Sequence, residues 1–195
     1  MRESKQQPQV FVPQMAPPDS AVNGRHEAVK QDITAGVAQS STEITGEAIC
    51  GTGAWHAAAL DIARGASRYL RSLGCAVVAE LPLADGRRAD LMALDPRGGI
   101  IILEVKSCLN DFRTDQKWQD YRQWCDRFYF AVDVHFPQEH IPEECGLILA
   151  DRFDAEALRE PPEHRLDAAR RKTVTLPFAR CAAFRLHGLD DPEIW

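Results

Sequence analysis

Several common functional signatures are missing from this 195-residue sequence. No apolar run approaches the roughly 18–20 residues that a membrane span needs, and the first residues lack the charged-then-apolar pattern of a signal peptide. The six cysteines form no CxxC pair, so there is no sign of a zinc knuckle or a dithiol redox motif. The six histidines form no HxH or HxxxH pair, which argues against a histidine metal site. We therefore expect a soluble, cytoplasmic protein with reduced cysteines.

Acidic residues outnumber basic ones, 29 to 23, so the net charge is −6. That balance argues against broad electrostatic binding to DNA, although the distribution of charge matters more than its total. The segment 159–185 holds seven basic and three acidic residues, which gives a local net charge of +4. It is either a solvated helix face or a surface that binds the DNA backbone. For the second alternative, the DNA-binding candidates are Arg170, Arg171 and Lys172.

The composition changes near residue 50. Residues 1–50 hold Gln, Pro, Ser, Thr and scattered charges without an apolar period. Such a segment buries too little surface to offset its ordering entropy, so we predict a disordered tail. Residues 51–195 are expected to form one folded domain, for which the hydrophobic content of 45% is sufficient.

Apolar periodicity within this domain predicts a helix, three strands, a second helix and two more strands. This order indicates an α/β sandwich with a mixed sheet. The segment 151–195 is expected to pack on the core, with a helix at 163–172 and an ambiguous stretch at 176–186. The predicted elements are, in chain order, helix 54–73, strands 75–83, 88–94 and 100–106, helix 111–127, and strands 128–134 and 146–150.

The third predicted strand ends with two charged residues in an otherwise apolar run, Ile-Ile-Ile-Leu-Glu-Val-Lys (100–106). Glu104 and Lys106 are two positions apart, so they project from the same face of the strand. A tight turn would bring Asp90, on the preceding strand, beside Glu104. Two carboxylates and an ammonium group would then meet at one end of an apolar sheet.

This arrangement suits phosphodiester hydrolysis. Asp90 and Glu104 offer hard oxygen ligands for Mg²⁺, and the carbonyl of Val105 could add another. Lys106 could orient the attacking water, help to deprotonate it, or stabilise the transition state. The structural alternative is a simple Glu–Lys pair at a strand end, because the tripeptide ExK is common.

The pattern Asp90…Glu104-Val105-Lys106 resembles that of the PD-(D/E)XK nuclease superfamily, and within it the MmcB family of bacterial DNA repair proteins. The similar stretches are GRRADLMAL (86–94), ILEVKSCLNDFRTDQKWQDYRQWCDRFYFAV (102–132), GLILAD (146–151) and HRLDAARRK (164–172). Together they span roughly residues 54–186. The short motif is weakly specific, whereas the longer run around it is much more specific.

The resemblance implies a restriction-endonuclease-like αβββαβ core, with a mixed central sheet flanked by helices. It also implies a Mg²⁺ or Mn²⁺ requirement and a role in DNA damage repair. Asp90 and Glu104 would bind the metal and Lys106 would be the catalytic lysine. Many relatives also place a glutamate on the first helix, where this chain has only Asp61; Glu80 on the first strand is the other accessory candidate.

Further candidates have two interpretations each. Lys117 and Tyr121 share a face of the predicted second helix and are accessory candidates near the phosphate, or they belong to a solvated face. Arg87 and Arg88 could contact DNA phosphates or neutralise the carboxylates. Trp118 and Trp124 could stack on bases, although core positions are the more usual place for tryptophans at this spacing.

Three functions fit these residues. The first is a metal-dependent endonuclease acting on damaged, branched or single-stranded DNA, which the complete Asp, Glu and Lys set favours. The second is a catalytically silent DNA-binding or scaffold module that recruits other DNA repair proteins, which the acidic net charge and the missing helix glutamate favour. The third is an RNA-processing enzyme, because the chemistry of the two substrates is the same.

Overall fold

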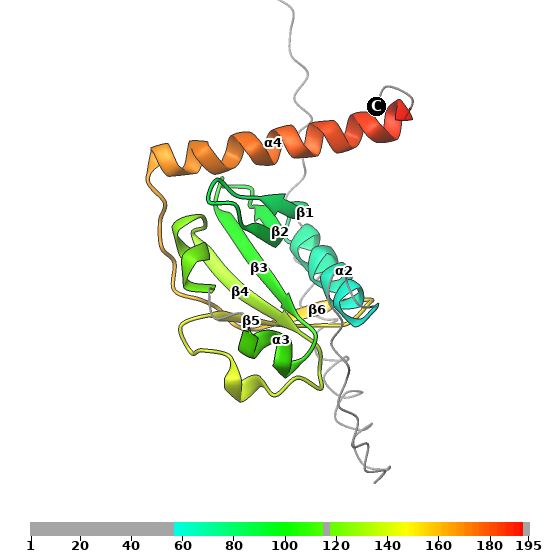
Figure 1. The fold of residues 1–195 in the computed structure, drawn as a ribbon, viewed down its shortest axis with the longest axis vertical. Helices are drawn as coiled ribbons and strands as arrows, with labels where there is room; N and C mark the ends of the chain where they lie inside the picture. Colours follow the sequence, from blue (N-terminus) through cyan, green and yellow to red (C-terminus); the bar gives the residue numbers. More distant parts are fainter. Residues whose placement is uncertain (1–56, 115–117, 193–195) are drawn as a thin grey trace, which may run out of the picture. The chain divides into compact units, whose positions relative to one another are not determined.

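A computed structural model describes residues 57–114 and 118–192 (Figure 1). The tail predicted at 1–50 lies outside these ranges. The described residues form one sheet of six strands, flanked by helices. The strands are β1 (Ala76–Pro82), β2 (Arg88–Leu94), β3 (Ile100–Lys106), β4 (Arg127–Val132), β5 (Gly146–Ala150) and β6 (Ala155–Arg159). The α-helices are α2 (Ala57–Ser72), α3 (Leu109–Thr114) and α4 (Ala168–Asp190), and the 3₁₀-helices are η2 (Trp118–Gln123) and η3 (Gln138–His140).

The sheet is mixed, and its strands lie in the order of the sequence. β1, β2 and β3 form an antiparallel meander. α3 and η2 lead from β3 into β4, which runs parallel to β3, as β5 does to β4. β6 closes the edge antiparallel to β5. The α/β class and the αβββαβ order are therefore confirmed.

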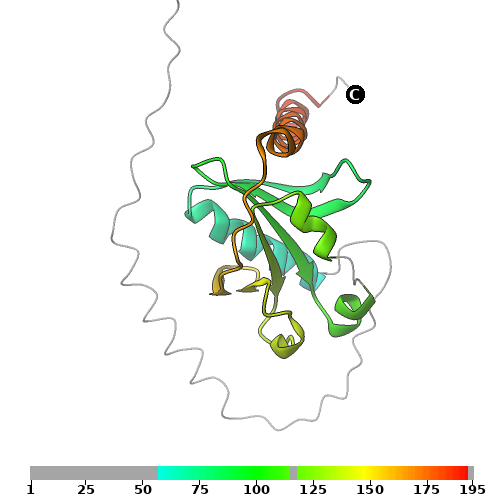
Figure 2. The same ribbon diagram turned by 90° about the vertical axis from the view of Figure 1, so that its left-hand side faces the viewer.

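Two apolar cores lie on the two faces of the sheet (Figures 1 and 2). α2 covers one face, where Ile62, Ala66 and Leu70 pack against the odd-numbered side chains of β3. The other face is covered by η2 and the first half of α4. Its core includes Ile100 and Ile102, the even-numbered side chains of β3. Because strand side chains alternate between faces, Glu104 and Lys106 belong to this second face.

Three of the strand predictions were accurate to the residue. The ranges 88–94, 100–106 and 146–150 are confirmed without change. Gly86 and Gly98 adopt positive φ angles of 85° and 81° in the turns that join the meander. Glycine takes up this conformation without steric cost, which is why the turns stand out in the sequence.

The single helix predicted at 111–127 is wrong. The described part of this range is divided between α3 and the 3₁₀-helix η2, and β4 already begins at Arg127. In η2 the large buried side chains Trp118 and Tyr121 are three residues apart. A 3₁₀ turn has three residues, so it places both on one side. The spacing of three was mistaken for α-helical periodicity.

The C-terminal part also differs from expectation. β6 was not predicted, because its exposed positions alternate with half-buried ones and it reads as polar. The helix predicted at 163–172 begins only at Ala168, and the stretch 176–186 belongs to the same helix, α4, which continues through Pro177. Only Val174 and Phe178 of α4 are buried, so the expected packing on the core is limited to its first half. Within the described ranges, no helix combines the length and apolarity that crossing a membrane requires.

Candidate active site

The end of β3 places charge inside the apolar core. Every residue of β3 is buried, and Glu104 and Lys106 are only 3% and 4% exposed. Lys106 Nζ lies 3.8 Å from Glu104 Oε2, so the two side chains share one face as expected. Burial of a charge is costly unless the charge is paired. The two residues therefore neutralise one another at the strand end.

Asp90 lies beside this pair. The backbone ladder between β2 and β3 runs from Leu94↔Ile100 to Leu91↔Leu103, and Asp90 is the next residue of β2. Here a side chain continues the pairing, because the amide of Val105 donates to Asp90 Oδ2 at 2.8 Å. The amide of Asp90 in turn approaches Glu104 Oε1 at 3.4 Å. The expected juxtaposition of Asp90 with Glu104 is thus confirmed.

The donor set suits a hard cation. Within the described ranges, no group of three or more His, Cys, Asp or Glu side chains is placed to hold a metal ion. Asp90 and Glu104 alone provide two carboxylates, and Mg²⁺ commonly binds one or two carboxylates while keeping several waters. In a strand, the N–H and C=O of one residue point to the same side. The carbonyl of Val105 therefore faces the side on which its amide meets Asp90, and the set fits Mg²⁺ or Mn²⁺.

The accessory acids lie at different distances from this centre. Glu80 on β1 is flanked by the register pairs Ala79↔Leu91 and Leu81↔Ala89, so it lies opposite Asp90. It has a positive φ angle of 50°, and its carboxylate is 3.6 Å from Arg88. A non-glycine residue in this region is strained, and such strain is often found at functional sites.

Asp61, the alternative acid, lies on α2. That helix covers the opposite face of the sheet, and Asp61 Oδ1 is 3.9 Å from Arg152. It is therefore not part of the cluster. Lys117 lies outside the described residues.

The helix η2 contacts the hairpin that carries Asp90. The hydroxyl of Tyr121 donates to the backbone carbonyl of Arg88 at 3.1 Å, and its ring is 6% exposed. Arg87 forms an ion pair with Asp120 of η2 and lies 3.4 Å from Asp85. Both predicted arginines thus have carboxylate partners, Arg88 through Glu80. Whether either also contacts phosphate stays a prediction.

Trp118 and Trp124 are core residues, with exposed fractions of 6% and 4%. Their second role is to support arginines. The Arg122 guanidinium lies 4.9 Å from the ring centroid of Trp118, and that of Arg170 lies 4.6 Å from the ring centroid of Trp124. These cation–π contacts leave the tryptophan rings covered. Base stacking on either ring is therefore not favoured.

The basic segment 159–185 is not one continuous surface. Arg159 donates to the backbone carbonyls of Cys145 and Pro142. Arg171 donates two hydrogen bonds of 2.8 Å to the two carboxylate oxygens of Asp126. Lys172 is exposed. The predicted DNA-binding role therefore suits Lys172 better than Arg171, whose guanidinium is already engaged.

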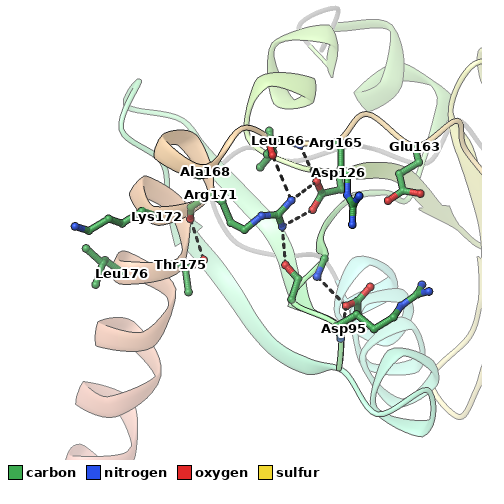
Figure 3. Close-up of a pocket in the computed structure, with 13 residues that line it drawn as sticks. Asp95, Asp126, Glu163, Arg165, Leu166, Ala168, Arg171, Lys172, Thr175 and Leu176 are labelled. Atoms are coloured by element: carbon green, nitrogen blue, oxygen red, sulfur yellow. Dashed lines mark hydrogen bonds and ion pairs between the residues drawn. The ribbon is translucent and has the colours of Figure 1, made fainter.

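Figure 3 shows the surroundings of this pair, a cavity of about 870 Å³ between the β2–β3 turn and the start of α4. Asp126 is 2% exposed and also accepts hydrogen bonds from the amides of Ile100 and Leu166, at 2.7 and 2.8 Å. Burial acts to raise the pKa of Asp126, but the hydrogen bonds from Arg171 and the two amides outweigh it and hold this pKa below its usual range. The cavity is thus walled by a satisfied ion pair, at the opposite end of β3 from Glu104.

Sequence reasoning missed Asp126, Asp120 and Asp85. An acid directly before a buried strand, as in Cys-Asp-Arg at 125–127, was the available signal for Asp126. No local signal marked the contacts of η2 with the hairpin, because they join residues more than 30 positions apart.

Comparison with known proteins gives one family and two structures. The model of the MmcB-like DNA repair protein family matches residues 49–193. A protein of unknown function from Silicibacter pomeroyi is 48% identical, with a TM-score of 0.68 over 69% of this chain and 92% of that chain. A repair endonuclease from Pyrococcus abyssi is 20% identical over 35% of this chain and 31% of that chain, and its TM-score of 0.24 is too low to support any conclusion. No curated protein matches.

Proposed function

The chain belongs to the MmcB-like family of DNA repair proteins, and we propose that it is a metal-dependent endonuclease that hydrolyses phosphodiester bonds in damaged, branched or single-stranded DNA. The observation that carries this proposal is the cluster at the end of β3. Glu104 lies within ion-pair reach of Lys106 and accepts from the amide of Asp90, whose carboxylate accepts from the amide of Val105, all in an apolar sheet. A pure scaffold has no need for two carboxylates and a lysine at this place.

The roles follow from the chemistry of each group. Asp90 and Glu104 would hold Mg²⁺ or Mn²⁺ together with the carbonyl of Val105. When bound, such an ion polarises a phosphate oxygen and lowers the pKa of a coordinated water. Lys106 would act on the attacking water or on the charge that develops on phosphorus. Glu104 would keep the Lys106 ammonium at this position, because the two are 3.8 Å apart and buried.

DNA would be held by basic side chains outside this cluster. Arg87 and Arg88 flank it on the hairpin, and Arg170 and Lys172 lie on the first turns of α4. Arg171 is the remaining member of the predicted DNA-binding set. Its bonds to Asp126 suit it to fixing α4 on the sheet. Glu80 would be an accessory acid beside Asp90, and Tyr121 an accessory residue through its bond to Arg88.

A variant series tests the proposal. Glu104→Gln and Asp90→Asn should lose Mn²⁺ binding in calorimetry and lose cleavage of a panel of single-stranded, duplex, flap and junction DNA. The metal-free melting temperature of Asp90→Asn should stay the same or rise, because the carboxylate cluster repels itself without a cation. That of Glu104→Gln should fall, because the substitution removes the carboxylate 3.8 Å from the buried Lys106 ammonium. Lys106→Ala should bind Mn²⁺ but not cleave. Glu156→Gln, an exposed carboxylate on β6, is the matched control and should behave as the parent.

Two results would contradict the proposal. Unchanged Mn²⁺ binding in the carboxylate variants would mean that the metal site is elsewhere. Unfolding of these variants, with no metal-dependent cleavage by the parent, would identify Glu104 and Lys106 as a structural ion pair in a silent module. The same panel with RNA, and with EDTA in place of the cation, separates DNA from RNA as substrate.

A further inference from the structure

The backbone ladder of β3 does not extend along the hairpin that precedes Asp90. The β2–β3 ladder covers Leu91–Leu94, so the hairpin beyond it, 81–89, pairs only within itself in the backbone register. Its turn is closed by the bond from the Leu83 amide to the Arg87 carbonyl at 2.8 Å. A two-stranded hairpin is marginally stable by itself. The position of Asp90 relative to Glu104 therefore depends on what else holds the hairpin.

Helix η2 and Trp124, the residue that follows it, hold the hairpin by contacts at three places. At the base, nearest to Asp90, Tyr121 Oη donates to the Arg88 carbonyl at 3.1 Å. In the middle, Asp120 forms an ion pair with Arg87. At the tip, Trp124 Nε1 donates to Asp85 Oδ2 at 2.8 Å. The hydrogen bonds from Trp124 and from the Arg87 amide, together with the charge of Arg87, outweigh the effect of burial and lower the pKa of Asp85, so this carboxylate is ionised at neutral pH.

The helix itself is fixed to the sheet through its aromatic rings. The ring of Tyr121 stacks on Phe128 of β4 with 5.7 Å between centroids and an interplanar angle of 14°. Trp118 also stacks on Phe128, at 6.0 Å. β4 is paired with β3 in a register that places Phe128 beside Ile102 and Phe130 beside Glu104. Contacts thus run without a break from Glu104 through β4 and η2 to the hairpin.

We infer that Tyr121, with Asp120 and Trp124, is a positioning residue that holds Asp90 at the distance from Glu104 that a shared cation requires. The inference rests on the proposed metal site but concerns different residues. Tyr121 acts on the Arg88 carbonyl, two residues before Asp90. Loss of its hydroxyl should let the hairpin move away from β3. Asp90 Oδ2 would then leave the amide of Val105.

The variant Tyr121→Phe tests this inference, because it removes the hydroxyl and keeps the stacked ring. Tyr129→Phe is the matched control. It removes the hydroxyl of another buried tyrosine, which bonds Glu160 at the other core. In Tyr121→Phe, hydrogen exchange of the Val105 amide should accelerate several-fold relative to that of Leu103 in the same strand. Mn²⁺ affinity should fall about tenfold, in the range typical of residues that orient metal ligands.

Excess Mn²⁺ should restore cleavage by Tyr121→Phe, because the ligands remain and only their placement is lost. A role limited to stability would slow cleavage in proportion to unfolding and would not respond to metal. Asp120→Asn, at an exposed position, should also accelerate exchange of the Val105 amide and weaken Mn²⁺ binding, but by less than Tyr121→Phe does. It also serves as the test if Tyr121→Phe does not fold.

The inference is overturned if Val105 exchange and Mn²⁺ affinity are the same in Tyr121→Phe and Tyr129→Phe. It is distinguishable from a failure of the proposed function. If the parent and Glu104→Gln bind Mn²⁺ equally, the metal site is wrong. The exchange of the Val105 amide then decides by itself whether η2 positions Asp90.

Discussion

The two ends of β3 both bury carboxylates, but they bury them in different ways. At the start of the strand, Asp126 accepts four hydrogen bonds of 2.7–2.8 Å, two of them from the planar fork of Arg171. At the end of the strand, Glu104 is 3.8 Å from the ammonium of Lys106, and the amide of a second acid, Asp90, lies 3.4 Å from the Glu104 carboxylate. One end is a closed ion pair with matched charges. The other brings two acids and one base together.

The pair at the start of β3 suits a structural role, whereas the group at its end is the one for which we propose a chemical role. A bidentate Arg–carboxylate pair uses its geometry fully and is well suited to fixing one element against another. Asp126 and Arg171 accordingly fasten α4 and the segment before it to the sheet. Two neighbouring carboxylates are unfavourable for stability by themselves, and the proposed cation binding would account for their presence.

The largest expected effect is on stability at the start of β3. Arg171→Met leaves the buried carboxylate of Asp126 without its charged partner and should lower the free energy of unfolding by about 3–5 kcal/mol, as measured by urea denaturation. Arg170→Met is the matched control. It removes only the contact with the Trp124 ring, which is worth about 0.5–2 kcal/mol. Equal losses in the two variants would show that the pair with Asp126 is not special.

A smaller effect concerns pH. Because the pKa of Asp126 is lowered in the folded state, its stabilising contribution is present above the unfolded value of about 3.9 and is lost as the pH falls through the lower folded value. The parent should therefore exceed Asp126→Asn in melting temperature by a constant margin at pH 5–7. Below about pH 4 the margin should shrink. A margin that does not change with pH would mean that the charge of Asp126 contributes nothing.

The smallest expected effect is on DNA binding at the exposed part of α4. Lys172→Ala should weaken binding similarly for all sequences and reduce the slope of log affinity against log salt by about one. Arg71→Ala, an exposed cation on α2, is the control and should leave the slope as in the parent. An unchanged slope in Lys172→Ala would assign this basic segment to a solvated surface and not to the interface.

The sequence by itself determined the α/β class, the meander and the meeting of Asp90 with Glu104. These features depend on alternation along a strand and on short turns. The bond between the Val105 amide and Asp90 joins residues only 15 positions apart. A tight antiparallel turn leaves few possible registers, because the turn type and loop length fix the pairing of a hairpin.

Only the tertiary structure decided which basic residues are engaged and how η2 holds the hairpin. Arg171 and Asp126 are 45 positions apart, and Tyr121 and Arg88 are 33 apart. No local pattern distinguishes Arg171 from its neighbours Arg170 and Lys172, because all three lie in one helical turn with similar chemistry. Their roles differ because α4 crosses the sheet at one angle, so that one side chain meets a buried carboxylate, one an indole ring and one solvent. Val174 and Phe178 pack α4 against the core, and local sequence patterns do not specify that contact.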